Sequence, residues 1–308
     1  MKKKQHQPKT IGLIGTVTKD YITFESRSIP NRIGMGGILY QAAALCGMGH
    51  QVQLITQIGE ELLPEFNNIT HKWKNLITDS LYTVPGPGNQ VHLFYPISGE
   101  RKEVLVSYVP PLTSGQIIPF LTGLDMLVLV INSGFDISLK DWKDSLKKAA
   151  CPVWMDVHSL VLAKKIGAHR EYIAFSEWQD WVEGAAYLQA NKKEVSAALG
   201  NPKKTFGEQE LLSFGSAAFN RKVSAVFVTL GKDGVMFLTP GHSRKIRSSS
   251  DVKVLDTTGC GDVFCAAAVD SLLNNNDFAA AAKAGVKLAV KAAETAGVEE
   301  IYNLAGDI

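Results

Sequence analysis

The sequence has few cysteines, four in 308 residues, and they are Cys46, Cys151, Cys260 and Cys265. No two of them form a Cys-x-x-Cys pair, and no histidine lies at zinc-ligand spacing from them. This spacing excludes a zinc site of the common Cys/His type. We therefore expect four reduced thiols in a cytoplasmic protein.

Positive and negative charges are nearly balanced, since Lys and Arg total 32 and Asp and Glu total 30. Four lysines lie in the first ten residues, so the rest of the chain is not basic and offers no electrostatic footprint for nucleic acid. No run of 18 apolar residues occurs, and the basic start is followed by His6, Gln7 and Pro8 instead of an apolar segment. We expect no membrane span, no signal peptide and no nucleic-acid partner.

What the sequence does contain is an alternation of β-rich runs and helical stretches. The expected strands are Ile11–Gly15, Val52–Thr56, Leu124–Ile131, Val153–Asp156, Ala185–Leu188 and Ala225–Thr229. The expected helices are about Gly37–Met48, Glu208–Phe219, Val263–Leu273 and Phe278–Thr295, with another opened by the Ser-x-x-Asp pattern of Ser138–Asp141. Such alternation indicates βαβ units, and hence an α/β fold with a mainly parallel sheet flanked by helices.

Two stretches interrupt this alternation. Residues 19–34 contain a β-prone run and no helix. Residues 90–109 are typical of a hairpin, with Gln90–Pro96 and Lys102–Val109 on either side of a Ser98-Gly99 turn. We expect both stretches to form a small accessory sheet beside the main one.

The segment most informative about chemistry is Asp-Thr-Thr-Gly-Cys-Gly-Asp at residues 256–262. A strand-like run, Val252–Leu255, precedes it, and a long helical pattern follows. Gly259 and Gly261 permit close backbone approach at the helix start, where free N–H groups and the helix dipole favour an anion. Asp262 in the same turn is either a helix cap or a functional carboxylate, and the complete seven-residue pattern favours the second.

This segment resembles the signature of the ribokinase-like carbohydrate kinases, the PfkB family, whose usual form is Asp-Thr-x-Gly-Ala-Gly-Asp. Cys260 is the single departure. Further motifs resemble the family in the right order: Gly15–Asp20, Gly36-Gly37, Ser98–Arg101, Asn191–Glu194 and Thr229–Gly234. The resemblance implies a three-layer α/β/α fold in one kinase domain over residues 1–308, with a small β lid from about 19–34 and 90–109.

The resemblance also implies roles on the phosphate side of the site. Asp262 would accept the proton of an attacking hydroxyl, and the N–H groups of Gly259, Cys260 and Gly261 would bind the transferred phosphoryl group. ATP is the expected donor, with Mg²⁺ on its phosphates. The residues expected to contact the nucleotide or organise its Mg²⁺ are Asn191, Glu194, Thr229, Gly231, Gly234 and Thr257.

Three of these positions have alternatives that the sequence leaves open. Asn191 and Glu194 also have the spacing of a helix N-cap and a first-turn acid. Asp256 faces a monovalent cation in relatives activated by K⁺, but an aspartate there can also bond the backbone of its own turn. At Cys260, the helix start lowers the pKa of the thiol, whereas Asp256 and Asp262 raise it.

On the acceptor side, the resemblance implies contacts from Asp20, Gly36, Gly37, Gln41 and Arg101. Gln41 stands where the family commonly has an asparagine, and its amide can make similar hydrogen bonds. Asp156-Val-His158 replaces a common Asp-x-Asn, and His158 is expected at the surface or behind the site. These departures leave the identity of the acceptor open.

Rival nucleotide-binding motifs are missing: no Gly-x4-Gly-Lys-Ser/Thr occurs, and Gly34-Met-Gly36 fails as a dinucleotide fingerprint because residue 39 is leucine. The sequence therefore favours an ATP-dependent kinase that phosphorylates a hydroxyl of a small sugar or sugar derivative. The alternatives are a nucleoside kinase of the same family and a non-catalytic sugar-binding or regulatory protein on the same fold. The β-prone segments also permit a homodimer formed through the lid.

Overall fold

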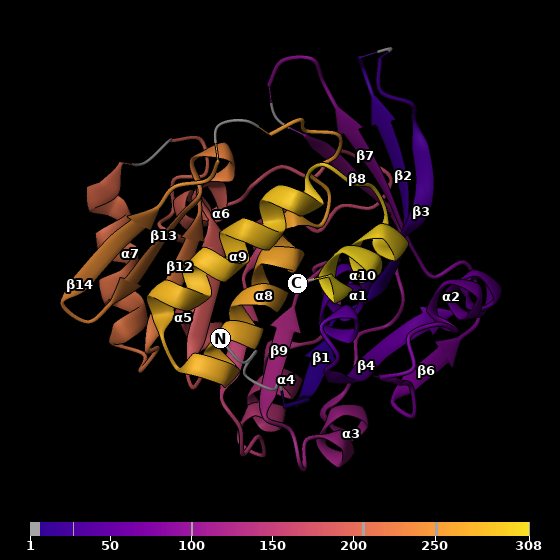
Figure 1. The fold of residues 1–308 in the computed structure, drawn as a ribbon, viewed down its shortest axis with the longest axis horizontal. Coiled ribbons are helices and arrows are strands. Elements are labelled where there is room, and N and C mark those ends of the chain that lie inside the picture. The colour runs from indigo at the N-terminus through magenta and orange to yellow at the C-terminus, as the bar shows by residue number, and fades with distance from the viewer. Residues whose placement is uncertain (1–6, 27, 100, 205–206, 250–251, 308) are drawn as a thin grey trace.

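The computed structural model describes residues 7–26, 28–99, 101–204, 207–249 and 252–307. Its centre is a ten-stranded sheet (Figure 1). In spatial order the strands are β14 (His242–Ile246), β13 (Val235–Thr239), β12 (Ala225–Thr229), β11 (Tyr187–Asn191), β10 (Val153–Asp156), β9 (Met126–Val130), β1 (Thr10–Ile14), β4 (Gln51–Gly59) and β5 (Leu76–Ile77), and β6 (Leu81–Val84) also pairs with β4.

The strands from β12 to β5 and β6 run parallel, and β13 and β14 join one edge in antiparallel pairs. The sequence explains this arrangement, because β9 reads Met-Leu-Val-Leu-Val and is buried along its whole length. A parallel strand covered on both faces needs such an unbroken apolar run. The expected mainly parallel α/β sheet is confirmed.

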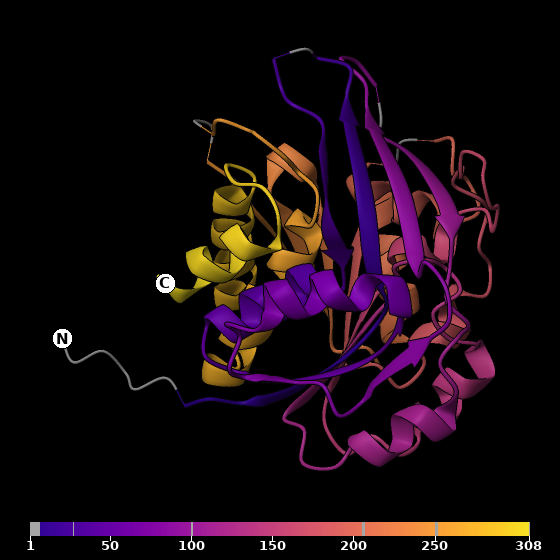
Figure 2. The same ribbon diagram turned by 90° about the vertical axis from the view of Figure 1, so that its right-hand side faces the viewer.

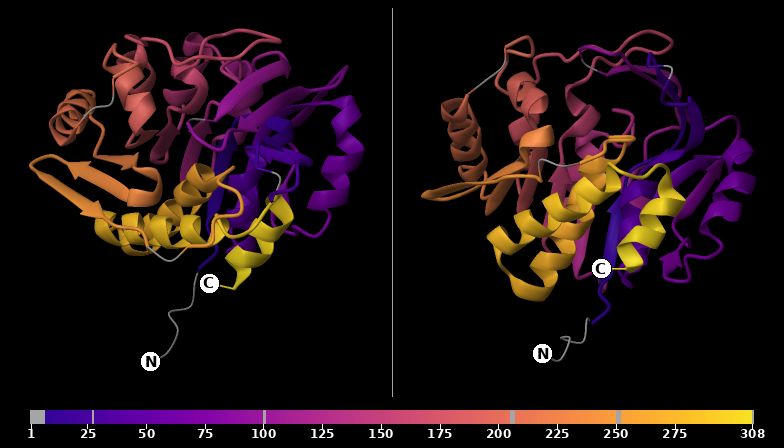
Figure 3. Two further views of the ribbon diagram at one scale, coloured as in Figure 1. Left: turned by 90° about the horizontal axis from the view of Figure 1, so that it is seen from above. Right: turned by 45° about the horizontal axis from the view of Figure 1, so that its top comes forward.

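Helices cover both faces of the sheet, which gives the expected three layers (Figure 3, left). One apolar core joins the sheet to α1 (Leu39–Gly47), α2 (Leu63–Thr70), α8 (Cys260–Asn275), α9 (Phe278–Ala292) and α10 (Val298–Gly306). The other joins it to α3 (Ser114–Ile117), α4 (Leu139–Leu146), α5 (Trp178–Val182), α6 (Lys192–Ala198) and α7 (Glu208–Phe219). Short 3-10 turns complete the chain: η1 (Glu60–Leu62), η2 (Ile118–Phe120), η3 (His158–Val161) and η4 (Gly231–Asp233). No helix in the described ranges is long and apolar enough to cross a membrane.

A second, four-stranded sheet projects from the central one (Figure 2). Its strands, in order, are β3 (Arg32–Gly37), β2 (Val17–Phe24), β7 (Asn89–Tyr95) and β8 (Lys102–Ser107). The two stretches expected to form an accessory sheet therefore lie side by side in it. Its use as a lid and the single-domain boundary 1–308 stay predictions, and Glu100 of the Ser98–Arg101 turn lies outside the described residues.

Two expectations about strands are wrong. Val252–Leu255 has no regular structure, because the run reaches no strand edge: the N–H of Leu255 donates to the carbonyl of Ala293 after α9, and Val254 is 55% exposed. The strand expected at Ala185–Leu188 starts later, at Tyr187, because Ala185 is still bonded to Val182 at the end of α5. This shift places Asn191 at the carboxyl end of β11.

Candidate active site

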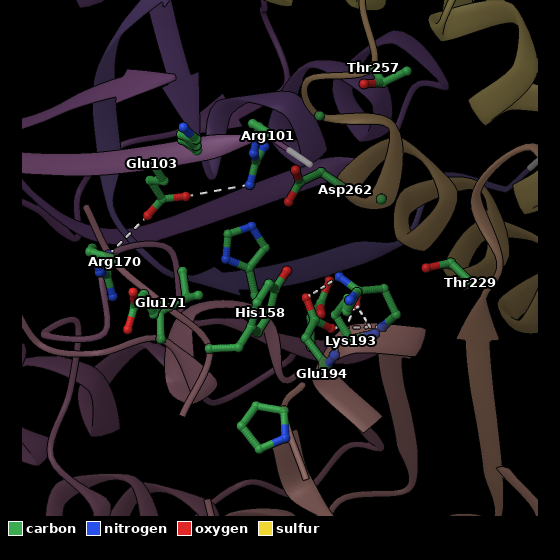
Figure 4. Close-up of a pocket in the computed structure, with 18 of the residues that line it drawn as sticks. Arg101, Glu103, His158, Arg170, Glu171, Lys193, Glu194, Thr229, Thr257 and Asp262 are labelled. Carbon is green, nitrogen blue, oxygen red and sulfur yellow. Dashed lines mark hydrogen bonds and ion pairs between the residues drawn. The ribbon is translucent and has the colours of Figure 1, made fainter. Parts of the chain in front are cut away.

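A cavity of about 900 Å³ opens where the carboxyl ends of β10, β11 and β12 meet the start of α8 and one edge of the second sheet (Figure 4). Asp156, Asn191 and Thr229 end these three strands and line the cavity, and Asp262 lines it from α8. Open parallel sheets bind ligands at this edge, since the loops that follow the strands diverge there. The cavity is therefore the candidate active site.

Asp262 is a buried carboxylate with one oxygen that has no hydrogen-bond partner among the described residues. It lies in the first turn of α8, but the N-cap of that helix is Gly259, so the alternative that Asp262 caps the helix is wrong. Its Oδ1 atom has no hydrogen-bond partner within the described chain. Burial raises the pKa of Asp262 to about 7, while the nearby Arg101 acts in the opposite direction. A carboxylate in this state can accept a proton near neutral pH.

Gly259 is required by both conformation and packing. Its φ is +76°, and a Cβ atom there would lie 2.4 Å from the ring of Tyr40 on α1. Among the described residues, the N–H groups of Gly259 and Gly261 make no hydrogen bond, whereas that of Cys260 donates to the carbonyl of Thr257 at 3.3 Å. The expectation of three free N–H groups is thus corrected to two, because the Cys260 N–H closes a turn.

The thiol of Cys260 contacts the carbonyl oxygen of Asp256 at 3.9 Å. Burial, followed by the charges of Asp256 and Asp262, raises its pKa to about 12. Burial and the two carboxylates therefore outweigh the effect of the helix start on this pKa. Cys260 is a protonated, weakly nucleophilic thiol at neutral pH.

Asn191 and Glu194 form a capping box at the start of α6, so their structural alternative is observed. The side chain of Asn191 accepts from the N–H groups of Lys193 and Glu194, and the Glu194 carboxylate accepts from the Asn191 backbone and amide at 2.7 and 2.5 Å. Both residues nevertheless line the cavity. Burial raises the pKa of Glu194 to about 7.

No group of three or more His, Cys, Asp or Glu side chains in the described ranges is placed to hold a metal ion by itself. Mg²⁺ dehydrates reluctantly and commonly stays bound to ligand phosphates and several waters, so a carboxylate and an amide near those phosphates could hold its water ligands. Glu194 and Asn191 are the cavity residues that such an ion would reach.

Gln189 is a site residue that sequence reasoning missed. Its Nε2 amide donates to Oδ2 of Asp156 at 2.8 Å and to the carbonyl of Gly261 at 3.0 Å, so it connects β10 to the first turn of α8. The signal was its position two residues before Asn191 on one strand, which puts both side chains on the same face. Burial, then Glu194 and Asp262, raises the pKa of Asp156 well above its usual value.

Both carboxylate oxygens of Asp256 are engaged. Oδ1 accepts from the N–H and the hydroxyl of Thr258 at 2.9 and 2.7 Å, which is the turn alternative considered above. Oδ2 lies 3.1 Å from Nη2 of Arg32 on β3. A K⁺ ion at Asp256 would therefore compete with the guanidinium group of Arg32.

The residues expected to bind the acceptor pack closely against one another. Asp20 is buried on β2, where Thr18 donates to it at 2.6 Å and burial raises its pKa to about 6. A Cβ atom at Gly36 would lie 2.0 Å from Oδ2 of Asp20, and Gly37 has a φ of +62°. The two glycines thus let β3 pass directly beside the Asp20 carboxylate. Gln41 is fully buried on α1, and neither amide atom has a partner within the described chain.

Not all expected residues share the cavity. Those that line it are Arg101, Asn191, Glu194, Thr229, Thr257, Gly259, Gly261 and Asp262. Those that do not are Asp20, Gly36, Gly37, Gln41, Gly231, Gly234, Asp256 and Cys260.

Two further cavity residues come from the segment between β10 and α5. His158 lines the cavity, so the expectation that it lies at the surface or behind the site is wrong. Arg170 is 2% exposed, and its Nη1 donates to Glu103 at 3.0 Å. Nη2 of Arg101 lies 3.4 Å from Oε2 of Glu103, so Glu103 contacts both arginines. No sequence motif predicts this contact among the three residues.

A family model described as pfkB family carbohydrate kinase matches residues 138–303, which is more than half of the chain. The chain belongs to this family. Its match begins at the cap of α4 and includes the turn after β12 and the cavity residues Asn191 and Asp262.

Solved structures of ribokinase-family proteins share the fold over nearly the whole chain. A pyrophosphate-dependent kinase in the ribokinase family is 15% identical, with a TM-score of 0.79 over 96% of this chain and 99% of that one. Ribokinase from Thermotoga maritima is 18% identical, with a TM-score of 0.73 over 97% and 98%. A nucleoside kinase from Methanocaldococcus jannaschii is 16% identical, with a TM-score of 0.70 over 98% and 100%. The pfkB-family assignment and the ribokinase-like fold therefore agree.

Proposed function

We propose that this pfkB-family protein is an ATP-dependent kinase that transfers a phosphoryl group to a hydroxyl of a small sugar or sugar derivative. The observation that carries this proposal is Asp262, a buried carboxylate with an unpartnered oxygen and a pKa of about 7. It stands in the same helical turn as two unbonded glycine N–H groups. Transfer to an alcohol needs a proton acceptor beside a site for phosphoryl charge, and this turn has both.

In the proposed reaction, Asp262 takes the proton of the attacking hydroxyl. The N–H groups of Gly259 and Gly261, with the dipole of α8, stabilise the charge on the transferred phosphoryl group. Gln189 holds the Gly261 carbonyl and so fixes the orientation of that turn. Mg²⁺ bound to the donor phosphates supplies charge neutralisation, and Asn191 and Glu194 would hold its water ligands.

The cavity wall supports a polyol over a nucleoside as acceptor. Leu162 and Pro202 are its apolar lining residues and Tyr95 and Tyr172 add two aromatic rings with hydroxyl groups, whereas most other lining residues are polar or charged. A nucleobase binds best between apolar or aromatic faces, whereas hydroxyl groups need many hydrogen-bond donors and acceptors. One ribokinase-family neighbour was solved with myo-inositol and another with ribose and ATP, which is in keeping with this class of acceptor.

Pyrophosphate is a second candidate donor. A kinase that depends on pyrophosphate is among the structural neighbours, with a TM-score of 0.79. Lys193 and Lys203 line the cavity, and ammonium groups bind phosphate oxygens whether or not a nucleoside is attached.

The test offers Mg-ATP or Mg-pyrophosphate with a panel of sugars, cyclitols and nucleosides, and measures release of ADP or orthophosphate that depends on the acceptor. Turnover with a polyol supports the proposal, and the productive donor separates ATP from pyrophosphate. Saturable polyol binding by calorimetry without turnover of either donor would favour a non-catalytic binding protein instead.

A further inference from the structure

His158 has a constrained backbone and a fixed ring. It follows β10 at the start of η3 with a φ of +37°, a conformation that residues other than glycine seldom adopt. Its Nδ1 atom lies 3.1 Å from the carbonyl of Ile131 and 3.0 Å from the hydroxyl oxygen of Ser159. Strained residues of this kind are held in place by their surroundings and cluster at ligand sites.

The hydrogen bonds determine which ring nitrogen carries the proton. The Ser159 hydroxyl donates its own hydrogen to the carbonyl of Asn132 at 2.9 Å, so towards His158 its oxygen can only accept. The Ile131 carbonyl is also an acceptor. Both partners therefore require a hydrogen on Nδ1, which leaves Nε2 with a bare lone pair as long as the ring is neutral.

The remaining nitrogen faces the cavity. Burial lowers the pKa of His158, which keeps the ring neutral at physiological pH. Nε2 makes no hydrogen bond with any part of the chain that the structure describes. Figure 4 shows the ring in the cavity between Arg101 and Glu194, directed towards Arg101. A neutral nitrogen that can only accept is thus presented beside a guanidinium group that can only donate.

We propose that Nε2 of His158 binds the phosphoryl acceptor by accepting a hydrogen bond from one of its hydroxyl groups. This inference rests on the proposed function and narrows its acceptor class. A carboxylate, carbonyl or phosphate oxygen has no hydrogen to donate to Nε2, whereas a hydroxyl can donate to Nε2 and accept from Arg101 at once. The site therefore favours an acceptor with a hydroxyl at this position, as in a neutral polyol.

The variant His158→Asn isolates the proposed contact. Asparagine tolerates a positive φ, and its amide N–H can replace Nδ1–H as a donor to Ile131, but it has nothing at the place of Nε2. We expect the Kd and KM of the acceptor to rise about 10-fold, as for the loss of one hydrogen bond, with the KM of the donor unchanged. His71→Asn, an exposed histidine at the end of α2, is the matched control and should change neither.

A series of singly deoxygenated acceptors identifies the hydroxyl. The wild type should bind one deoxy analogue about 10-fold more weakly than the parent, and His158→Asn should bind both equally. Acceptor binding can be measured by calorimetry without turnover. A protein that binds the acceptor but transfers no phosphoryl group would overturn the proposed function, and the contact with His158 would still be tested by these affinities. Equal acceptor affinity of wild type and His158→Asn would overturn the inference.

Nitrogen-15 NMR of the histidine rings gives a readout that does not depend on the fold of a variant. In the wild type, the resonance assigned to His158 should show a protonated Nδ1 and an unprotonated Nε2 between pH 6 and 8, and the Nε2 signal should move on acceptor binding. A protonated Nε2 in the free protein, or a signal that the acceptor does not move, would contradict the inference.

Discussion

Nη2 of Arg32, on β3 of the second sheet, lies 3.1 Å from Oδ2 of Asp256 in the loop that leads into α8. The hydroxyl groups of Tyr95 and Thr258 meet at 2.7 Å beside this pair. A charge pair and a hydrogen bond thus tie the second sheet to the loop that precedes Gly259. The guanidinium group of Arg32 is thus the positive charge that lies against the Asp256 carboxylate.

We predict that turnover is the same in potassium and in tetramethylammonium buffers of equal ionic strength, because Arg32 already neutralises Asp256. Arg32→Gln leaves a buried carboxylate unpaired and should lower the free energy of unfolding by about 1–3 kcal/mol. K⁺ should then restore part of that stability and of turnover. Arg221→Gln, at a half-buried arginine 3.9 Å from Glu183 and outside the cavity, is the control. A wild type that needs K⁺ for turnover would contradict this assignment.

Gly36→Ala tests the close contact between β3 and Asp20. The new Cβ would lie 2.0 Å from Oδ2 of Asp20, so the carboxylate must move. We expect the KM of the acceptor to rise about 10-fold or more with that of ATP unchanged, since charged hydrogen bonds contribute about 1.5–3 kcal/mol. Gly34→Ala on the same strand has nothing within 4 Å of its new Cβ and should leave both constants unchanged. If the two variants have the same kinetic constants, Asp20 does not bind the acceptor.

Gln189→Met keeps the side-chain length and removes both hydrogen bonds that hold Asp156 and the Gly261 carbonyl. We expect kcat to fall about 5- to 30-fold, corresponding to about 1–2 kcal/mol for the two bonds, while substrate KM values change little. Gln179→Met is the matched control, because that glutamine bonds Arg221 outside the cavity. An unchanged kcat for Gln189→Met would show that the first turn of α8 is positioned without this bridge.

The raised pKa of Asp262 predicts how stability depends on pH. The folded state releases this proton near pH 7, and the unfolded state releases it near 3.8, so the folded state binds more protons in between. Stability therefore falls as pH rises through this window. Asp262→Asn removes the effect and should be more stable than the wild type at pH 8, by roughly 2–4 kcal/mol, and about equal at pH 4. Denaturant unfolding of both proteins at pH 4 and pH 8 measures this difference, and equal stabilities at pH 8 would contradict the raised pKa of Asp262.

The sequence predicted most of the central sheet because its signals are local. An unbroken apolar run such as β9 fits a buried parallel strand, and the glycines before α8 fit the tight turn at a helix start. The strand expected at Val252–Leu255 failed for a non-local reason: its residues are apolar, but no strand edge is available to them. The amino-acid composition of a segment does not show whether a neighbouring strand is available to pair with it.

The same limit applies to the site. Asp262, Gly259 and Asn191 could be identified from one continuous segment each. The position of Gln189 two residues before Asn191 indicates a shared face of the strand, but its bond to Gly261 and the contact of His158 with Ile131 join residues far apart in the chain, which no local motif reveals. The residues that one short motif supplies could therefore be predicted, whereas those whose place depends on contacts between distant elements could not.

The most direct test of the central claim is phosphorus NMR of the wild type and of Asp262→Asn, each with Mg-ATP and the polyol that the wild type binds. We predict a new phosphate-monoester resonance on the polyol with the wild type, at a rate that falls about tenfold per pH unit below pH 7. Asp262→Asn should form it about 10²–10⁴-fold more slowly while binding ATP normally. Equal rates of monoester formation by the two proteins, or ATP consumption without a phosphorylated polyol, would contradict the account.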